Sequence, residues 1–196
     1  MTVLDDRTEM AEESDELSLD MMFDGIERMA VPEGYKVEVV EGAIHMTPQR
    51  DVHWQIIRRI VRALEDKYGV DVKVTSDVRI DFPGHLNGFA PDVAKLRDGA
   101  MKSAKGRWDH RDIEFVAEVI SKDTAANDYG PKLAAYATAE VPVYLITDPY
   151  TGEWHLHTLP EGGKYRSTLS LHFGDPVDLT ATVVSLMLRT DDFPRD

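Results

Sequence analysis

An aspartate, a glutamate and a lysine in the middle of the sequence have side chains suited to phosphate-ester chemistry. Asp92 follows Pro91 in a strand-like stretch, Glu118 lies in the apolar run FVAEVIS at residues 115–121, and Lys132 follows 14 residues later. A carboxylate buried in a sheet without a partner is unfavourable by several kcal/mol or more. Glu118 therefore needs a cationic partner, either an arginine or lysine side chain or a bound metal ion.

Asp92 and Glu118 could converge if the strands that carry them are neighbours. Two carboxylates held close together repel each other unless a proton or a cation separates them. Hard oxygen ligands select Mg²⁺ or Mn²⁺, and such an ion polarises a phosphoryl oxygen and lowers the pKa of a bound water. A lysine nearby stabilises developing negative charge or orients that water. From the pattern alone, two acids that simply face solvent are the alternative.

The spacing of apolar residues predicts the elements that position these groups. Two short apolar runs around Glu41-Gly42 indicate a β-hairpin over residues 37–46. A helix that ends at Gly69 follows, because its apolar residues recur every three or four positions. We expect Trp54 and Tyr68 to be core anchors of this helix rather than base-stacking platforms. The apolar residues are Trp54, Ile57, Val61, Leu64 and Tyr68.

The rest of the chain predicts a mixed sheet. One strand or a bent pair is expected over residues 70–82, and further strands over 89–97, 113–121, 141–149 and, as an outer strand, 153–159. A helix over 128–140 lies between two of these strands, which implies a parallel crossover. We therefore predict an α/β (α+β) fold, with a central mixed β-sheet flanked by helices in one domain, residues 21–196. His155 and His157 point to one face of the last strand, where an exposed pair is the simpler interpretation than a metal site.

Acidic residues dominate the chain, whose formal net charge is -14. The first 20 residues carry eight acids and one arginine, and they are expected to form a disordered tail, with a regulatory or DNA-mimicking tail as the alternative. This balance argues against tight phosphate binding by one broad basic face. It leaves room for a local basic patch, and the densest lies in the predicted loop at residues 99–112. Its cations are Lys102, Lys105, Arg107 and Arg111.

Three features that the sequence lacks bear on the cellular location of the protein. The sequence has no cysteine and no apolar run of about 18 residues, so we expect no disulfide, no thiolate metal site and no membrane span. The N-terminus lacks the basic region and apolar block of a signal peptide. A cytoplasmic protein is the simplest expectation.

Motifs along most of the chain resemble the Uma2 family (DUF820), restriction endonuclease-like proteins of the PD-(D/E)XK nuclease superfamily. The resemblance runs from about Val31 to Pro149 and more loosely to the C-terminus. The segment VEVVEGAIHMT resembles the family's Tyr-Glu-Leu-hydrophobic-Asp-Gly segment, and His53 stands at the position of a helix-initial histidine. The other matching residues are Pro91-Asp92, Glu118-Val119-Ile120-Ser121, Thr124, Asp128, Lys132-Leu133, Tyr136, Val141-Pro142, Tyr144 and Asp148-Pro149.

The resemblance implies a restriction endonuclease-like core and roles for particular residues. Asp92 and Glu118, with the carbonyl of Val119, are expected to bind Mg²⁺ or Mn²⁺. The superfamily's lysine normally lies two residues after the glutamate, where this chain has Ile120, so Lys132 is interpreted as the migrated lysine. Glu38 is expected to supply a third carboxylate to the metal, or a base that lies behind the metal ligands.

Departures from the family pattern remove no expected metal ligand. Ser121-Lys122-Asp123-Thr124 replaces the usual Ser-Pro-Ser-Thr, Val37 replaces a tyrosine, and Glu140 replaces a glycine.

The leading hypothesis is a metal-dependent endonuclease that hydrolyses DNA phosphodiester bonds. Lys102, Lys105, Arg107, Arg111 and His53 are the expected DNA contacts, and a homodimer is an expectation that nothing in the sequence fixes. One alternative is a catalytically silent module of the same fold that binds nucleic acid or a protein partner. Another is a metal-dependent hydrolase acting on a different phosphate ester or a nucleotide.

Overall fold

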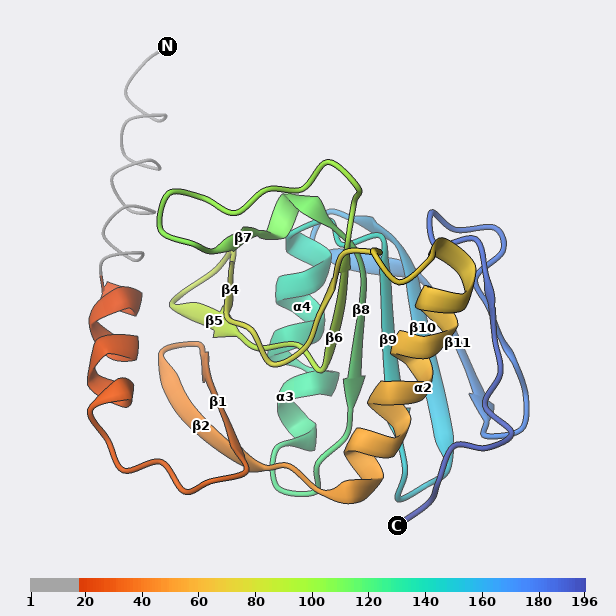
Figure 1. The fold of residues 1–196 in the computed structure, drawn as a ribbon, viewed down its shortest axis with the longest axis horizontal. Coiled ribbons are helices and arrows are strands. Elements are labelled where there is room, and N and C mark those ends of the chain that lie inside the picture. Colours follow the sequence, from red (N-terminus) through yellow and green to blue (C-terminus); the bar gives the residue numbers. More distant parts are fainter. Residues whose placement is uncertain (1–17) are drawn as a thin grey trace.

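A six-stranded mixed sheet forms the centre of the computed structural model, which describes residues 18–196 (Figure 1). Its strand order is β11-β10-β9-β8-β6-β3. Strands β8 and β9 are parallel, whereas the other neighbouring pairs are antiparallel. The predicted mixed sheet and its parallel crossover are therefore confirmed. The strands are β3 (Val74–Thr75), β6 (Val93–Leu96), β8 (Ile113–Val119), β9 (Val143–Asp148), β10 (Glu153–Glu161) and β11 (Lys164–His172).

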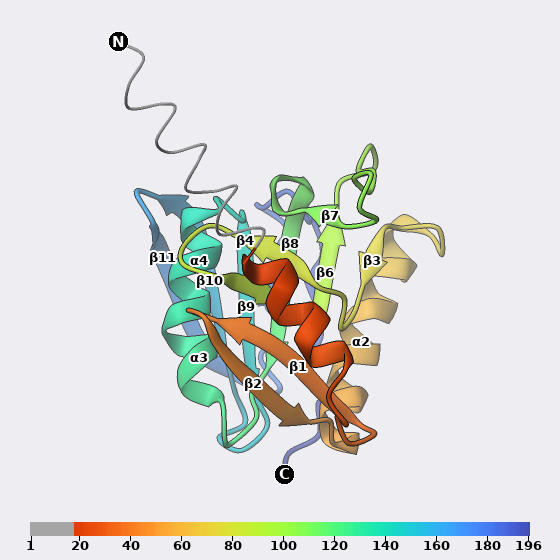
Figure 2. The same cartoon turned by 90° about the vertical axis from the view of Figure 1, so that its left-hand side faces the viewer.

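A second, five-stranded sheet lies beside the first in the order β2-β1-β5-β4-β7 (Figure 2). The predicted hairpin is confirmed as β1 paired with β2. The remaining strands are short, and β12 (Val177–Asp178) pairs with β13 (Met187–Leu188) as a separate ladder. The strands of the second sheet are β1 (Tyr35–Val40), β2 (Ala43–Pro48), β4 (Ile80–Phe82), β5 (Asn87–Phe89) and β7 (Trp108–Asp109), the last followed by the 3-10 turn η1 (His110–Asp112).

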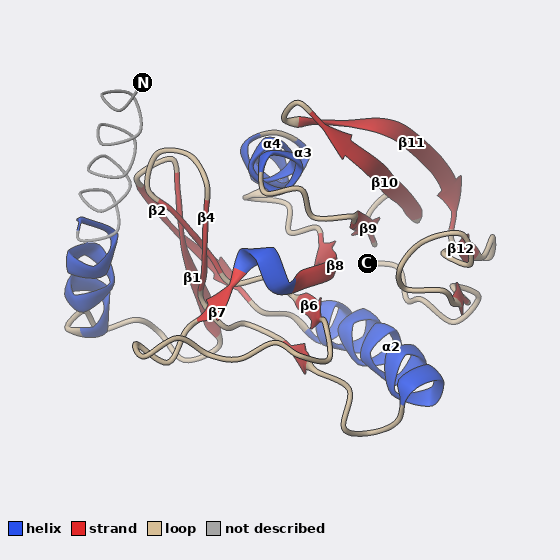
Figure 3. Cartoon of the chain, turned by 90° about the horizontal axis from the view of Figure 1, so that it is seen from above, coloured by secondary structure: helices blue, strands red, loops and turns tan. Residues whose placement is uncertain are grey.

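Helices cover both faces of the six-stranded sheet (Figure 3). Helix α2 (Asp51–Tyr68) covers one face, and α3 (Ala125–Tyr129) with α4 (Pro131–Thr138) covers the other. Successive side chains of a strand point to opposite faces. Phe115 and Ala117 of β8 therefore pack in the core cluster on the α2 side, while Val116 packs with Tyr136 of α4. Glu118 shares the face of Val116 and so points toward α4.

The predicted core anchors of α2 are wrong. Trp54 is 57% exposed and Tyr68 is 38% exposed. The buried residues of the helix are His53, Ile56, Ile57, Ile60 and Leu64. Ile57 and Leu64 of the predicted face are buried as expected, but the buried face is shifted toward His53, Ile56 and Ile60. A histidine counts as polar in the sequence pattern, although His53 is buried with its Nε2 atom 3.0 Å from the Ile120 carbonyl.

Three other elements differ from the sequence prediction. The helix expected over 128–140 is two helices that meet at Gly130. Residues 70–82 form two strands that belong to different sheets. The expected outer strand β10 lies between β9 and β11, so His157 is buried rather than exposed. Its Nδ1 atom lies 3.0 Å from the Thr168 hydroxyl, and burial lowers the pKa of His157 to about 4.

Residues 18–27 form a helix that packs on the outer face of β1 (Figure 2). Leu19 and Ile26 of this helix contact Val39 in a small apolar cluster. The disordered tail predicted over residues 1–20 overlaps this helix at residues 18–20, where the prediction is wrong, and residues 1–17 lie outside the described residues. No helix within residues 18–196 is both long and apolar enough to span a bilayer.

Candidate active site

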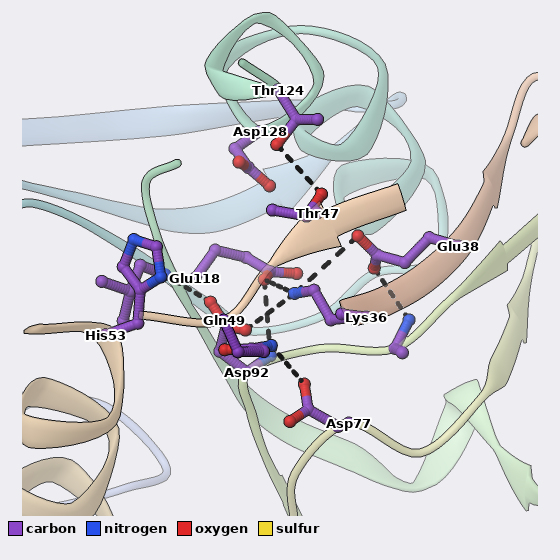
Figure 4. A network of polar contacts seen from close by, with 12 residues as sticks. Lys36, Glu38, Thr47, Gln49, His53, Asp77, Asp92, Glu118, Thr124 and Asp128 are labelled. Carbon is purple, nitrogen blue, oxygen red and sulfur yellow. Dashed lines mark hydrogen bonds and ion pairs between the residues drawn. The ribbon is translucent and has the colours of Figure 1, made fainter. Parts of the chain in front are cut away.

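Two neighbouring strands bring Asp92 and Glu118 together. Val93 in β6 is paired with Ala117 in β8, so Asp92, just before β6, lies beside the end of β8. Two hydrogen bonds fix the carboxylates: Val119 N–H donates to Asp92 Oδ2 at 2.7 Å, and Asp92 N–H donates to Glu118 Oε2 at 3.4 Å. Both side chains are almost fully buried, with Asp92 at 3% and Glu118 at 1% exposure. The expected proximity of the two acids is thus observed (Figure 4).

Lys132 reaches the two acids from the first turn of α4, and together with its neighbours they form what we call the acid cluster. Its Nζ lies 2.6 Å from Glu118 Oε1 and 3.0 Å from Asp128 Oδ1. Asp128 precedes it by four residues across the break at Gly130. Pro131 at the start of α4 has the fixed φ that suits a first helical position, so the break places Lys132 in that first turn. Lys132 is therefore an inward-pointing cation, 1% exposed.

Glu38 approaches from strand β1 and faces the same lysine. Its Oε1 accepts a hydrogen bond from Ala90 N–H at 2.8 Å and lies 3.2 Å from Lys132 Nζ. Because side chains alternate along a strand, Val37 and Val39 point to the N-terminal helix while Glu38 points to the cluster. The hairpin thereby adds a third carboxylate, which the sequence comparison anticipated for this residue.

Lys36 is the principal site residue that the sequence prediction missed. Its Nζ lies 2.7 Å from Asp92 Oδ1, 3.5 Å from Glu118 Oε2 and 3.8 Å from Glu38 Oε2 (Figure 4). A lysine two residues from a glutamate in a strand points to the same face, and that spacing was the available signal. Lys36 occupies the space between the two acids that were expected to hold a metal.

Buried charges set the ionisation of the cluster. Burial raises the pKa of Asp92, with Lys36 opposing and the charge of Glu118 reinforcing the shift. For Glu118, burial is outweighed by Lys132 and Lys36, which hold its pKa at about 2. Burial raises the pKa of Asp128 to about 7 against the opposing field of Lys132. The cluster therefore keeps Glu118 ionised and places Asp128 near its titration point at neutral pH.

Two tyrosine hydroxyls donate hydrogen bonds to residues of the acid cluster. Tyr136 donates to Glu118 Oε1 at 2.7 Å, and Tyr144 donates to the carbonyl of Asp128 at 3.0 Å. Burial and the charge of Glu118 raise the pKa of Tyr136 well above its ordinary value, so its hydroxyl keeps its proton as a donor. These two contacts tie α3 and α4 to the sheet at the level of the acids.

The residues expected to contact DNA occupy two different environments. His53 is buried at 3% exposure, and its Nε2 lies 3.0 Å from the carbonyl of Ile120, next to the acid cluster. The cations of the loop lie elsewhere and have local partners. Lys105 and Arg107 form ion pairs with Asp20, Arg111 pairs with Asp109 at 2.5 Å, and Lys102 lies over the ring of Trp108.

The space left inside the cluster is small. The cavity between the acids, the two lysines and His53 measures about 10 Å³, close to the space of one water molecule. Within residues 18–196, no three histidine or acidic side chains are arranged as a ready metal-binding group. The donor chemistry nevertheless suits a hard cation, because four carboxylates face only two ammonium groups.

The mixed sheet with helices on both faces is the fold of a restriction endonuclease-like protein. A family model described as "Putative restriction endonuclease", Uma2, matches residues 23–190, and the chain belongs to the Uma2 family. Among solved structures it is similar to "a putative nuclease belonging to DUF820" from Anabaena variabilis ATCC 29413. The TM-score is 0.65 at 15% identity, over 87% of this chain and 95% of that one. No curated protein matches the sequence.

Proposed function

We propose that this protein is a nuclease that hydrolyses DNA phosphodiester bonds with the help of Mg²⁺ or Mn²⁺. The observation that carries the proposal is the meeting of Glu118 and Glu38 at Lys132, whose Nζ lies 2.6 Å from Glu118 and 3.2 Å from Glu38, with Asp92 hydrogen-bonded to Glu118 beside them. Membership in a nuclease family supports the general reaction. The choice of DNA and of a divalent cation is our inference from the chemistry of the cluster.

Asp92, Glu118 and the carbonyl of Val119 are the groups that would hold the cation. When bound there, a divalent ion would polarise a phosphoryl oxygen and lower the pKa of a water molecule. The charge balance supports this assignment, since Glu38, Asp92, Glu118 and Asp128 oppose only Lys36 and Lys132. The buried cluster carries a net charge of -2 when all six groups are ionised and of -1 when Asp128 is protonated, so a bound divalent cation would offset the excess negative charge in either state.

The chain's own groups orient the reaction. Lys132 would donate hydrogen bonds to the phosphate oxygens that gain negative charge, as a positioned ammonium group does at low dielectric. Glu38 is held by Ala90 N–H, and its Oε2 would accept a proton from the attacking water. Val119 N–H holds Asp92 in place, and the Tyr136 hydroxyl does the same for Glu118. Burial of these groups excludes bulk water and strengthens each of the interactions.

Lys36 would have to withdraw before a cation could reach Asp92. Its present contacts, 2.7 Å to Asp92 and 3.5 Å to Glu118, compete directly with metal binding. This observation favours one second candidate, a catalytically silent module in which Lys36 neutralises the acids permanently. In that case the protein would bind nucleic acid or a partner without turnover.

Nicking of supercoiled plasmid tests the proposed reaction. Wild-type protein should nick DNA with Mg²⁺ or Mn²⁺ and not with EDTA. Asp92→Asn and Lys132→Met should each lower the rate at least about 100-fold, because each removes a group that acts on the transition state. The matched controls, Asp191→Asn and Lys164→Met, change exposed residues and should cut like the wild type.

Thermal melting and circular dichroism must accompany this assay. Removing one partner of a buried ion pair costs about 3–5 kcal/mol, so a folded state must be shown for each variant. DNA binding without cutting by the wild type would favour the silent module. Cutting that survives Asp92→Asn in a folded protein would refute the proposed site, and activity confined to small phosphodiesters would replace DNA by another phosphate ester.

A further inference from the structure

A groove on the outer side of α2 combines an exposed aromatic ring with arginines. It measures about 590 Å³ and lies between α2, the segment at Val70–Val74 and the start of the turn after β3. Trp54 lines one end and is 57% exposed. Arg58 and Arg62 follow at intervals of four residues, so all three side chains lie along one face of the helix.

The arginines of this groove differ in their partners. Arg59 is engaged by Asp192 at 2.9 Å and by the Gln55 carbonyl at 2.6 Å. Arg58 and Arg62 are exposed and, within the part of the chain that the structure describes, form no ion pair. The contrast with the loop at 102–111 is direct, since Lys105 and Arg107 contact Asp20. The groove thus offers cations that are not committed to a carboxylate.

The groove adjoins the acid cluster. Trp54 follows His53, which lines the cluster, and Ser76 in the groove precedes Asp77. Asp77 accepts a hydrogen bond from Gln49 at 3.2 Å, and its N–H donates to the Pro91 carbonyl at 3.0 Å, next to Asp92. Gln49 lines the cavity of the acid cluster, and both Gln49 and Asp77 are drawn near Asp92 in Figure 4. A chain lying in the groove would therefore lead toward Asp92 and Glu118.

We propose that this groove binds a single-stranded segment of DNA and guides it to the acid cluster, an inference that rests on the proposed nuclease function. Arg58 and Arg62 contact consecutive backbone phosphates, and Trp54 stacks on an unpaired base. A paired base has no free face for such stacking, so the ring selects a single strand. A second copy of the chain fits less well, because a symmetric contact at this patch would bring like-charged arginines together.

Binding to a fluorescent 20-nucleotide single strand in EDTA tests the groove apart from catalysis. The double variant Arg58→Ala/Arg62→Ala should bind at least about 10-fold more weakly at low salt. The slope of log K against log salt should fall by about 1.4, the value for two phosphate contacts on a single strand. The matched control Arg166→Ala/Arg189→Ala removes two exposed arginines on other strands and should bind like the wild type.

Trp54 gives an independent readout. Adding the strand should quench tryptophan fluorescence more in the wild type than in Trp54→Phe. Of the other two tryptophans, Trp154 is fully buried and Trp108 is half-buried outside the groove, so the quenching that is lost in Trp54→Phe reports on the groove. Trp54→Ala should weaken binding to the single strand by about 10-fold and change duplex binding little. Equal binding by all groove variants, or sedimentation showing a dimer that Trp54→Ala dissociates, would overturn the proposal.

The two proposals fail in different ways. If the wild type cuts plasmid while the groove variants bind and cut normally, the groove inference alone is wrong. If the groove variants lose binding while the wild type never cuts with any metal, the groove inference holds and the nuclease proposal falls. A wild type that neither binds nor cuts overturns both.

Discussion

At the scale of single residues, the cluster is held together by charges that could not be stable separately. Lys132 is 1% exposed, and a lysine buried alone would lose its proton. Here Asp128, Glu118 and Glu38 oppose the effect of burial and raise the pKa of Lys132 well above its ordinary value. The same compensation applies to Lys36, where burial is outweighed by Asp92, Glu38 and Glu118. Each lysine is therefore permanently charged as long as its acids are present.

The position of Lys36 beside Asp92 leads to a prediction about metal binding. In Lys36→Met, Asp92 loses its nearest cation and stability without metal should fall by about 3–5 kcal/mol. A divalent cation can then take the place of the ammonium group, so Mn²⁺ should raise the melting temperature of the variant more than that of the wild type. Differential scanning calorimetry with Mn²⁺ and with EDTA measures both shifts.

Lys164→Met, a change on an exposed part of β11, is the control for this measurement and should respond like the wild type. An equal response of Lys36→Met and the wild type to Mn²⁺ would show that Lys36 does not compete for the cation site.

The raised pKa of Asp128 leads to a prediction about how the free energy of unfolding depends on pH. Burial raises its pKa to about 7 in the folded protein from an ordinary value of 3.8. The folded state therefore holds this proton more tightly than the unfolded state, and the stability it provides is present below about pH 4. That stability is lost as pH rises toward 7, with a slope of at most about 1.4 kcal/mol per pH unit.

Asp128→Asn should accordingly show a smaller decline of unfolding free energy between pH 5 and pH 8 than the wild type, measured by urea denaturation at each pH (these two pH values bracket the pKa of about 7). Asp123→Asn, an exposed change close by in the sequence, should keep the wild-type decline. Parallel curves for Asp128→Asn and the wild type would mean that Asp128 is ionised throughout this range.

At the scale of elements, the sequence predicted which strands form and the parallel crossover better than it predicted the face to which each side chain points. The run of apolar residues at 113–119 identified β8, and the following helix required a parallel neighbour, which is β9. The position of Glu118 on the α4 side depends on which alternate residues face which helix, and apolar residues on both sides of it conceal that choice. Lys36 was missed for a related reason, since β1 belongs to a separate sheet and only the tertiary fold places it over Asp92.

Helix α2 and the α3–α4 break show a second limit of sequence patterns. Trp54 has a large apolar ring and is nevertheless exposed. Only the packing of α2 on the sheet shows that Ile56 and Ile60, which lie outside the predicted face, are buried. A glycine within a helical pattern is tolerated or ends a helix depending on its surroundings. At Gly130 a Cβ atom would lie 3.0 Å from the Ala126 carbonyl, so the turn is tighter than the pattern could indicate.

At the scale of the whole molecule, an acidic protein must present its few basic surfaces to a polyanion. The net charge is -14, and a field of this sign slows the approach of DNA, most strongly at low salt. Asp20 in the N-terminal helix adds a specific element, because it pairs with Arg79, Lys105 and Arg107. The N-terminal helix thereby neutralises part of the basic loop that the sequence predicted to contact DNA.

Asp20→Asn should therefore strengthen DNA binding at low salt. One exposed or half-exposed ion pair contributes about 0.2–1 kcal/mol, so the gain in affinity should reach at most about five-fold. Asp24→Asn removes the same charge from an exposed position of the same helix that has no ion pair within residues 18–196. Fluorescence anisotropy with a labelled duplex at two salt concentrations separates the local effect from the global one. An equal gain in both variants would assign the effect to net charge alone, whereas a gain confined to Asp20→Asn that disappears at high salt would mean that the N-terminal helix competes with DNA for the loop.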